Sequence, residues 1–232
     1  PSRSGASDVD VTIKLGGETV TESVEQKILS VTITKDLKWI KHVEKIKSDC
    51  NYRLSTLRRL CKYLSQKQLK TMAEGLIMSR LRYCLPTWGS EFIRFNESDQ
   101  SHAIFHDLQV LQNDVLRVIT GNKRSDHVRV KDMLASTNML SMNQLAGYNT
   151  LMEMWKSRAF NVPILSSMHV NKCTGEMSLR SKKAKNLQAS IDEPYARCAE
   201  KLWNQSSDRL KQTNLLTVAK TEAKATAKRL PL

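Results

Sequence analysis

The stretch ILSVTITKDLKWIKHVEKI, residues 28–46, changes its hydrophobic period partway along. Its first part alternates apolar and polar residues at Leu29, Val31 and Ile33, which is the two-residue period of a strand. From Trp39 onward the apolar residues recur every three or four positions, as in a helix, and lysines fill the gaps. The junction therefore predicts a short strand that leads directly into a basic amphipathic helix.

The predicted helix has one apolar face and one charged face. Asp36 suits its N-cap, because an aspartate there can accept hydrogen bonds from the first backbone N–H groups. The apolar residues lie within about 40° of one line on a helical wheel. These predicted core residues are Trp39, Val43, Ile46, Cys50, Leu54, Leu57, Cys61 and Leu64. The opposite, mostly positive side carries Lys38, Lys41, Lys45, Tyr52 and Arg59.

Residues 11–34 predict two or three short strands before this helix. Val11, Ile13 and Leu15 alternate with polar residues, and Gly16–Gly17 is typical of a hairpin turn. Strands this short bury little by themselves, so we expect them to need a partner sheet outside this chain. The small polar residues 1–9 are expected to be frayed.

A second amphipathic helix is predicted after Ser65, which suits an N-cap, and Pro86 is expected to end it. Its inward residues are predicted to be Leu69, Met72, Leu76 and Tyr83. Residues 87–100 are predicted to form a loop.

A third helix is predicted from about residue 101 to Thr120, with Gly121 as its C-cap. Its inward residues are predicted to be Ile104, Leu108, Leu111, Val115, Leu116 and Ile119. A short helix in 127–136, a longer one in 141–160, and two closing helices that Pro231 stops are predicted downstream. The polar residues 161–190 are expected to be irregular and mobile.

These elements predict a mainly α fold. A short N-terminal β-hairpin or strands precede a bundle of about six to seven helices. The predicted division places strands in 1–35, a first helical bundle in 36–90 and a second helical region in 91–232.

The charge balance favours a polyanionic partner. The 232 residues include 37 Lys and Arg against 23 Asp and Glu, a net charge of +14. The excess is concentrated in residues 35–82, where thirteen basic residues face four acids. A local excess of this kind favours nucleic acid first and an anionic membrane second. The alternative is a basic surface that is merely solvated.

Cysteine usage favours a reducing, intracellular setting. The five cysteines form no CxxC pair, and Cys50, Cys61 and Cys84 occupy apolar helical positions, where a free thiol behaves as a small core residue. His169 and Cys173 make an H-x3-C pair, but no second pair follows at zinc spacing, so neither a metal nor a cofactor is expected. Every apolar run is too short for a bilayer-spanning helix, so no membrane insertion is expected.

Four segments of the chain, in order from about residue 11 to the end, are similar to motifs of one known family. The first is Leu29-Ser30-Val31 followed by Leu37, Trp39, His42 and Val43, similar to a strand and an L-x-W-x-x-H-I pattern. The others are Leu81, Tyr83 and Trp88 in an L-x-Y-x-x-x-x-W signature, LQVLQNDVLRVITG, and the closing KLWNQ helices with their lysines. Through these segments the chain resembles the reverse transcriptases of non-LTR, LINE-type retrotransposons downstream of their catalytic aspartates.

The resemblance implies that 1–35 are a strand remnant of the palm, that 36–90 are thumb-like, and that 91–232 are a helical C-terminal region. Two departures matter. Ser30 replaces the family's Gly near the primer end, and the paired metal-binding aspartates are absent, the closest acids being Asp8 and Asp10. Since polymerisation needs carboxylates that hold two Mg²⁺ ions, no enzymatic activity is expected of this chain alone. It begins with Pro, which favours a fragment whose upstream palm and fingers would be partners.

The expected function is binding of RNA or an RNA–DNA hybrid through the phosphate backbone, in the nucleus or cytoplasm. The predicted contact residues are Lys38, Lys41, Lys45, Tyr52 and Arg59. Trp39 is expected in the core, and His42 is expected to be structural rather than catalytic. Two alternatives remain: a helical protein–protein interaction module that uses Met-rich segments such as 139–155, and a decayed, non-functional remnant.

Overall fold

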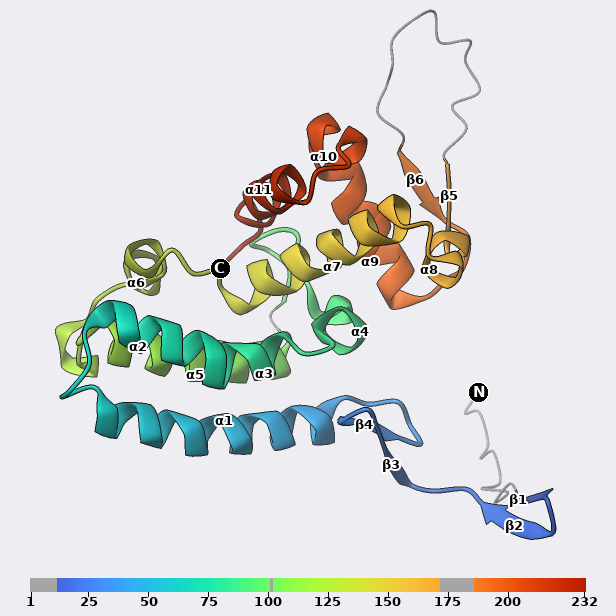
Figure 1. Cartoon of the computed structure of the whole chain (residues 1–232), viewed down its shortest axis with the longest axis horizontal. Helices are drawn as coiled ribbons and strands as arrows, with labels where there is room; N and C mark the ends of the chain where they lie inside the picture. Colours follow the sequence, from blue (N-terminus) through green and yellow to red (C-terminus); the bar gives the residue numbers. More distant parts are fainter. Residues whose placement is uncertain (1–11, 101, 172–185) are drawn as a thin grey trace, which may run out of the picture. The chain divides into compact units, whose positions relative to one another are not determined.

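The structure, a computed structural model, describes residues 12–100, 102–171 and 186–232 (Figure 1). The expectations for residues 1–9, Val11, Asp8, Asp10 and Cys173 lie outside this described part. The chain divides into two compact units, Pro1–Lys45 and Ile46–Leu232. Helix α1, Ile40–Leu60, crosses that boundary. The division predicted at residues 35 and 90 stays a prediction.

The strands of the first unit form two antiparallel hairpins. Strands β1 (Thr12–Leu15) and β2 (Glu18–Thr21) pair with Ile13 opposite Val20. Gly16 and Gly17 join them with φ of 59° and 90°, the backbone that a two-residue hairpin turn requires. The turn predicted at these glycines is confirmed.

The second hairpin shows that the strand predicted at the start of residues 28–46 is wrong in part. Strands β3 (Glu25–Ile28) and β4 (Val31–Thr34) pair with Ile28 opposite Val31. Leu29 and Ser30 are therefore the turn rather than a strand, with φ of 47° and 68°. The alternation was misleading because a two-residue turn preserves the strand period on both sides. A positive φ also gives a local physical reason why glycine suits position 30.

Helix α1 begins later than predicted. Asp36 is not its N-cap, because the helix begins at Ile40. The Asp36 carboxylate instead accepts hydrogen bonds from Thr34 Oγ1 at 2.6 Å and Lys38 N at 3.4 Å. Leu37, with φ of 53°, interrupts the helical backbone between Asp36 and the first turn.

Of the eight residues predicted to form the apolar face, four are buried, three are half-buried and one is exposed. Val43 in the first unit is buried, and Cys50, Leu54 and Leu57 are buried in the second unit. Trp39, Ile46 and Leu64 are half-buried. Cys61 was predicted in the core but is exposed, because the helix ends at Leu60 and its periodicity no longer applies.

The next helical segment contains a register shift. Ser65 is the predicted N-cap of α2 (Gln66–Ala73) and forms a capping box with Gln68. A π-helical turn, Glu74–Met78, joins α2 to α3 (Ser79–Arg82).

That π-helical turn explains why part of the predicted core face is wrong. Leu69 is buried as predicted, but Met72 and Leu76 are half-buried and Tyr83 is 46% exposed. The residues that are buried after Leu69 are Ala73, Ile77, Met78 and Leu81. The wider turn carries one extra residue, so it rotates the buried face relative to a regular helix.

Pro86 does not end that helix. α3 ends at Arg82, Cys84 adopts a left-handed backbone with φ of 49°, and Pro86 lies in the first turn of α4 (Leu85–Gly89). Residues 87–100 are therefore not all loop, since α4 and a 3₁₀ turn at Ser90–Phe92 occupy their start. Trp88 is fully buried and its Nε1 donates to Tyr83 O at 3.0 Å.

The central helices agree with prediction. α5 spans Ala103–Thr120, and Gly121 follows as its C-cap with φ of 75°. All six residues predicted to face inward from it are buried. The short helix α6 (Val130–Thr137) and the longer α7 (Met142–Ala159) are also confirmed.

The C-terminal third contains more regular structure than predicted. α8 (Pro163–Ser167) and the pair β5 (His169–Asn171) and β6 (Leu187–Ala189) lie in the segment expected to be irregular. The closing elements are α9 (Pro194–Gln205), α10 (Asp208–Gln212) and α11 (Leu216–Ala227). The short α10 was not predicted, and α11 ends four residues before Pro231.

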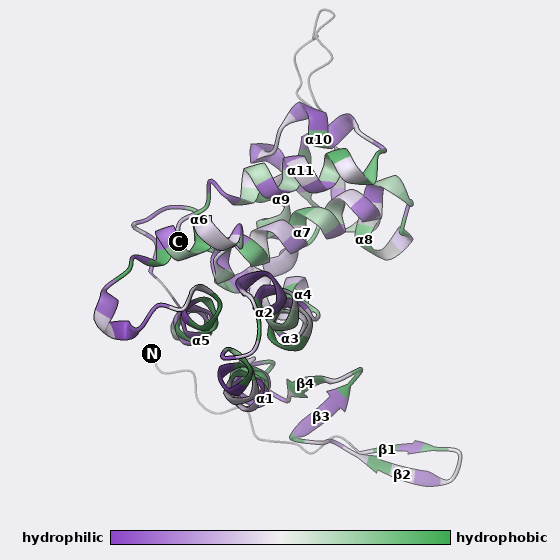
Figure 2. Cartoon of the chain, turned by 60° about the vertical axis from the view of Figure 1, so that its left-hand side comes forward, coloured by the Kyte–Doolittle hydropathy of each residue, from purple (hydrophilic) through white to green (hydrophobic). Residues whose placement is uncertain are grey.

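The predicted fold class is confirmed: the protein is mainly α, with short antiparallel strands at its N-terminal end. Figure 2 shows hydrophilic and hydrophobic residues side by side along α1, as expected of an amphipathic helix. In the part of the chain that the structure describes, no helix is long and apolar enough to cross a membrane.

Candidate nucleic-acid interface

All five residues predicted to contact nucleic acid are exposed. Lys41, Lys45, Tyr52 and Arg59 belong to α1, and Lys38 precedes its first turn. The three lysines belong to the first unit, and Tyr52 and Arg59 belong to the second. The exposure of the four α1 residues follows from the helical period, which turns them away from the line of buried apolar residues.

Lys41 and Lys45 share one carboxylate in the first unit. Lys41 Nζ lies 3.3 Å from Glu25 Oε2, and Lys45 Nζ pairs with Glu25 Oε1 and lies 3.4 Å from Thr32 Oγ1. Hydrogen bonds from Lys45 and then Lys41 lower the pKa of Glu25. Half or more of each lysine side chain is still exposed, at 52% and 57%. The pair therefore presents a smaller positive charge than its two ammonium groups alone would carry.

Glu25, the carboxylate that pairs with Lys41 and Lys45, was not predicted from the sequence as part of this surface. It belongs to β3, twenty residues before Lys45, and no local spacing connects the two. The antiparallel register of β3 and β4 places Glu25 opposite Thr34, close to the beginning of α1 in the chain. The one signal in the sequence is an acidic residue in the hairpin that directly precedes the basic helix.

Lys38 also has an acidic neighbour. Its Nζ lies 3.3 Å from Asp36 Oδ2, and its side chain is 69% exposed. The hydrogen bond from Thr34 is the largest cause that lowers the pKa of Asp36. Glu25 and Asp36 are thus ionised partners of Lys38, Lys41 and Lys45, and an incoming phosphate would have to share those lysines with them.

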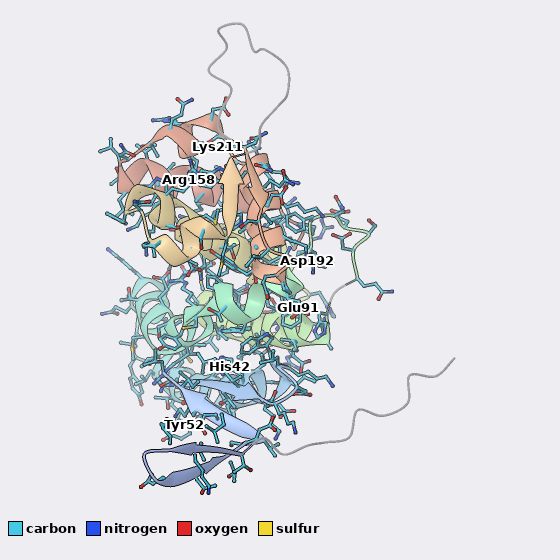
Figure 3. All side chains as sticks on the ribbon, turned by 90° about the vertical axis from the view of Figure 1, so that its right-hand side faces the viewer. His42, Tyr52, Glu91, Arg158, Asp192 and Lys211 are labelled. Atoms are coloured by element: carbon cyan, nitrogen blue, oxygen red, sulfur yellow. The ribbon has the colours of Figure 1, made fainter. Side chains whose placement is uncertain are left out.

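Tyr52 and Arg59 lie on the second-unit part of α1. Tyr52, labelled in Figure 3, is 74% exposed, so its ring can stack on a base or contact a sugar. Arg59 Nη2 donates to Thr56 Oγ1 at 3.3 Å, a contact within the same helix, and the residue is exposed. Both side chains are available to a ligand.

His42 occupies a buried position, consistent with the structural role expected of it. Its Nδ1 accepts a hydrogen bond from Thr32 N at 3.3 Å, which connects α1 to β4. Burial is the main cause that lowers the pKa of His42, and Lys45 contributes. The half-buried Trp39 packs edge-on against it, with ring centroids 6.4 Å apart.

Among the described residues, no group of three or more His, Cys, Asp or Glu side chains could hold a metal ion. His169 Nε2 lies 2.9 Å from Ala196 O, so the ring contacts α9 backbone. In the first unit, the exposed ammonium groups of Lys38, Lys41 and Lys45 can attract an anion electrostatically, in competition with the carboxylates that they contact.

The observed fold and surface define a mainly helical protein whose longest helix exposes basic residues and follows two β-hairpins. Comparison with models of protein families, with curated proteins and with solved structures found no match.

Proposed function

We propose that this chain is the non-catalytic, nucleic-acid-binding part of a retroelement reverse transcriptase. The exposed residues of α1 contact the phosphate backbone of RNA or an RNA–DNA hybrid in the manner of a thumb. The single observation that carries the proposal is that Lys38, Lys41, Lys45, Tyr52 and Arg59 are all exposed while the other side of the helix is buried.

Physical chemistry supports backbone contact over base recognition. Successive turns of one helix face present cations about 5–6 Å apart, which suits neighbouring phosphates. A hybrid with A-form geometry exposes its backbone and shallow minor groove, so a basic helix holds it by shape and charge. The motif order in the sequence, from the β3–β4 hairpin to the closing helices, adds support from resemblance.

Burial of the Met-rich segment 139–155 is an argument against its use as a protein–protein docking surface. Its large apolar residues that are buried in the second unit are Met139, Leu140, Met142, Leu145, Leu151, Met152, Met154 and Trp155.

The test is a salt titration of binding to an RNA–DNA hybrid by the full chain. Replacing Lys41, Lys45 and Arg59 with Gln removes three cations, so we expect the slope of log affinity against log salt to fall by about 2 to 3. Affinity at low salt should fall as well.

The matched control replaces Lys67, Lys131 and Lys220 with Gln, since these are exposed lysines of α2, α6 and α11. It removes the same charge from other surfaces. Equal losses in both triple variants would mean that only net charge matters, and the proposed face would be wrong.

A further inference from the structure

Three arginines of the second unit converge on a single carboxylate, Asp114 of α5. Arg58 Nη2 of α1 lies 3.2 Å from Asp114 Oδ2. Arg117 Nη1 lies 3.0 Å from Oδ1. Arg124 Nη2, just after α5, lies 3.0 Å from Oδ1 and 2.9 Å from Oδ2. Three separate places in the chain therefore supply one cluster, the Asp114 cluster.

The carboxylate of Asp114 is saturated while the arginines are not. An ionised carboxylate has about four acceptor sites, and the four hydrogen bonds above occupy them. Each guanidinium has about five N–H donors and uses only one nitrogen on Asp114. One negative charge faces three positive charges, so the cluster keeps an excess of two positive charges together with most of its donors.

Local structure holds these groups in place. Gly121 ends α5 with a left-handed backbone, and a 3₁₀ turn at Arg124–Asp126 follows directly. Asp126 accepts a hydrogen bond from Lys123 N at 2.7 Å, which stabilises that turn. Arg58 is in the last turn of α1, where cations interact favourably with the helix dipole.

Exposure differs between the carboxylate and its partners. The Asp114 side chain is 15% exposed, whereas Arg58 is 54% exposed and Arg124 is 72% exposed. Arg117 is 26% exposed, so the anion is sheltered and two of the three cations face water. The Asp114 carboxylate holds the guanidinium groups in fixed positions, and their remaining N–H donors point to no other acceptor in the cluster. A phosphate suits such groups because its oxygens accept pairs of N–H donors from arginine.

We propose that the Asp114 cluster binds a phosphate group, and that in this chain the phosphate belongs to a nucleic-acid backbone. The assignment of the phosphate to a nucleic-acid backbone rests on the proposed function, and it gives the chain a second contact surface for nucleic acid. Asp114 positions the arginines, and Arg58 and Arg124 provide the contacts.

The first experiment measures hybrid binding by the full chain across a salt series. Replacing both Arg58 and Arg124 with Gln should reduce the slope of log affinity against log salt by about 1.4 to 1.8, which corresponds to two lost phosphate contacts. The control replaces Arg197 and Arg209 with Gln. The side chains of Arg197 and Arg209 are 58% and 72% exposed, close to the values of Arg58 and Arg124, and each of these control arginines pairs with one carboxylate. A slope in the R58Q/R124Q variant equal to that of the control would overturn the contact to nucleic acid.

The second experiment uses inorganic pyrophosphate and follows arginine side-chain NH signals by NMR, so it does not depend on hybrid binding. We expect saturable shifts for Arg58, Arg117 and Arg124 and none for Arg197 or Arg209. Equal shifts for all five would overturn the phosphate site itself. If the wild-type chain does not bind hybrid but these three arginines respond selectively, the proposed function fails and the phosphate site stands.

Discussion

At the residue scale, backbone conformation and burial decide what individual side chains do. Ser30 has a positive φ in a hairpin turn, a backbone conformation that glycine adopts at lower cost than serine. His42 is buried and hydrogen-bonded to the strand before it, although the sequence shows it among lysines. Both residues belong to the stretch 28–46, and the local backbone and nearby contacts determine the conformation of each.

His42 should make stability depend on pH. Its pKa is lowered in the folded chain, so the unfolded chain binds the proton more readily. The contribution is present above about pH 6.5 and is lost as the pH falls through the lowered folded pKa. Urea unfolding at pH 7.5 and 5.5 should show a loss of up to about 1.4 kcal/mol from this group.

The His42→Gln variant should lose less stability on acidification, since it has no imidazole to protonate and its amide can still accept from Thr32 N. The matched control is His106→Gln, at an exposed position of α5. The prediction fails if wild type and His42→Gln lose the same free energy of unfolding between the two pH values.

At the element scale, hydrophobic periodicity was reliable inside regular helices and failed where the helix changed. All predicted inward residues of α5 are buried. The same reasoning placed Met72 and Leu76 in the core, yet the π-helical turn at Glu74–Met78 moves the buried face to other residues. One extra residue per turn is invisible to a wheel drawn at a fixed 100°.

The pairing of α1 with β3 predicts a gain of binding. Replacing Glu25 with Gln removes the carboxylate that Lys41 and Lys45 share, so both ammonium groups become available to phosphate. Affinity for an RNA–DNA hybrid should rise, and the salt slope should steepen by up to about 0.9.

Glu18→Gln is the control for this gain, because Glu18 is an exposed acid of β2 in the same unit and its loss changes the net charge equally. A similar gain in both variants would show that general charge, rather than the release of these two lysines, controls binding.

At the scale of the whole chain, long-range contacts hold the second unit together. No sequence pattern predicted these contacts. Asn143 of α7 accepts from Arg94 N at 2.8 Å and donates to Arg94 O and Pro231 O, both at 3.0 Å. Gln144 beside it donates to Leu230 O at 3.2 Å. These amides connect α7 to two segments far from it in the sequence.

Replacing Asn143 with Ala should destabilise the second unit by about 2 kcal/mol, because the half-buried backbone groups of Arg94 and Pro231 lose their partners. Thermal and urea unfolding of the full chain measure the effect. Asn51→Ala, at an exposed position of α1, should stay within about 0.5 kcal/mol of wild type. A small effect at Asn143 would mean that water replaces its hydrogen bonds.

The sequence by itself determined the mainly α class, the Gly16–Gly17 hairpin turn, the Ser65 and Gly121 caps, and the exposure of the basic side of α1. Each of these depends on neighbours within one or two turns, which periodicity and capping preferences encode. Only the tertiary structure decided the pairing of Glu25 with Lys41 and Lys45, the convergence of three arginines on Asp114, and the bonds of Asn143. Apart from Arg117, which lies three residues after Asp114 on α5, these contacts join groups on separate elements. Such contacts follow from how the elements pack rather than from local spacing.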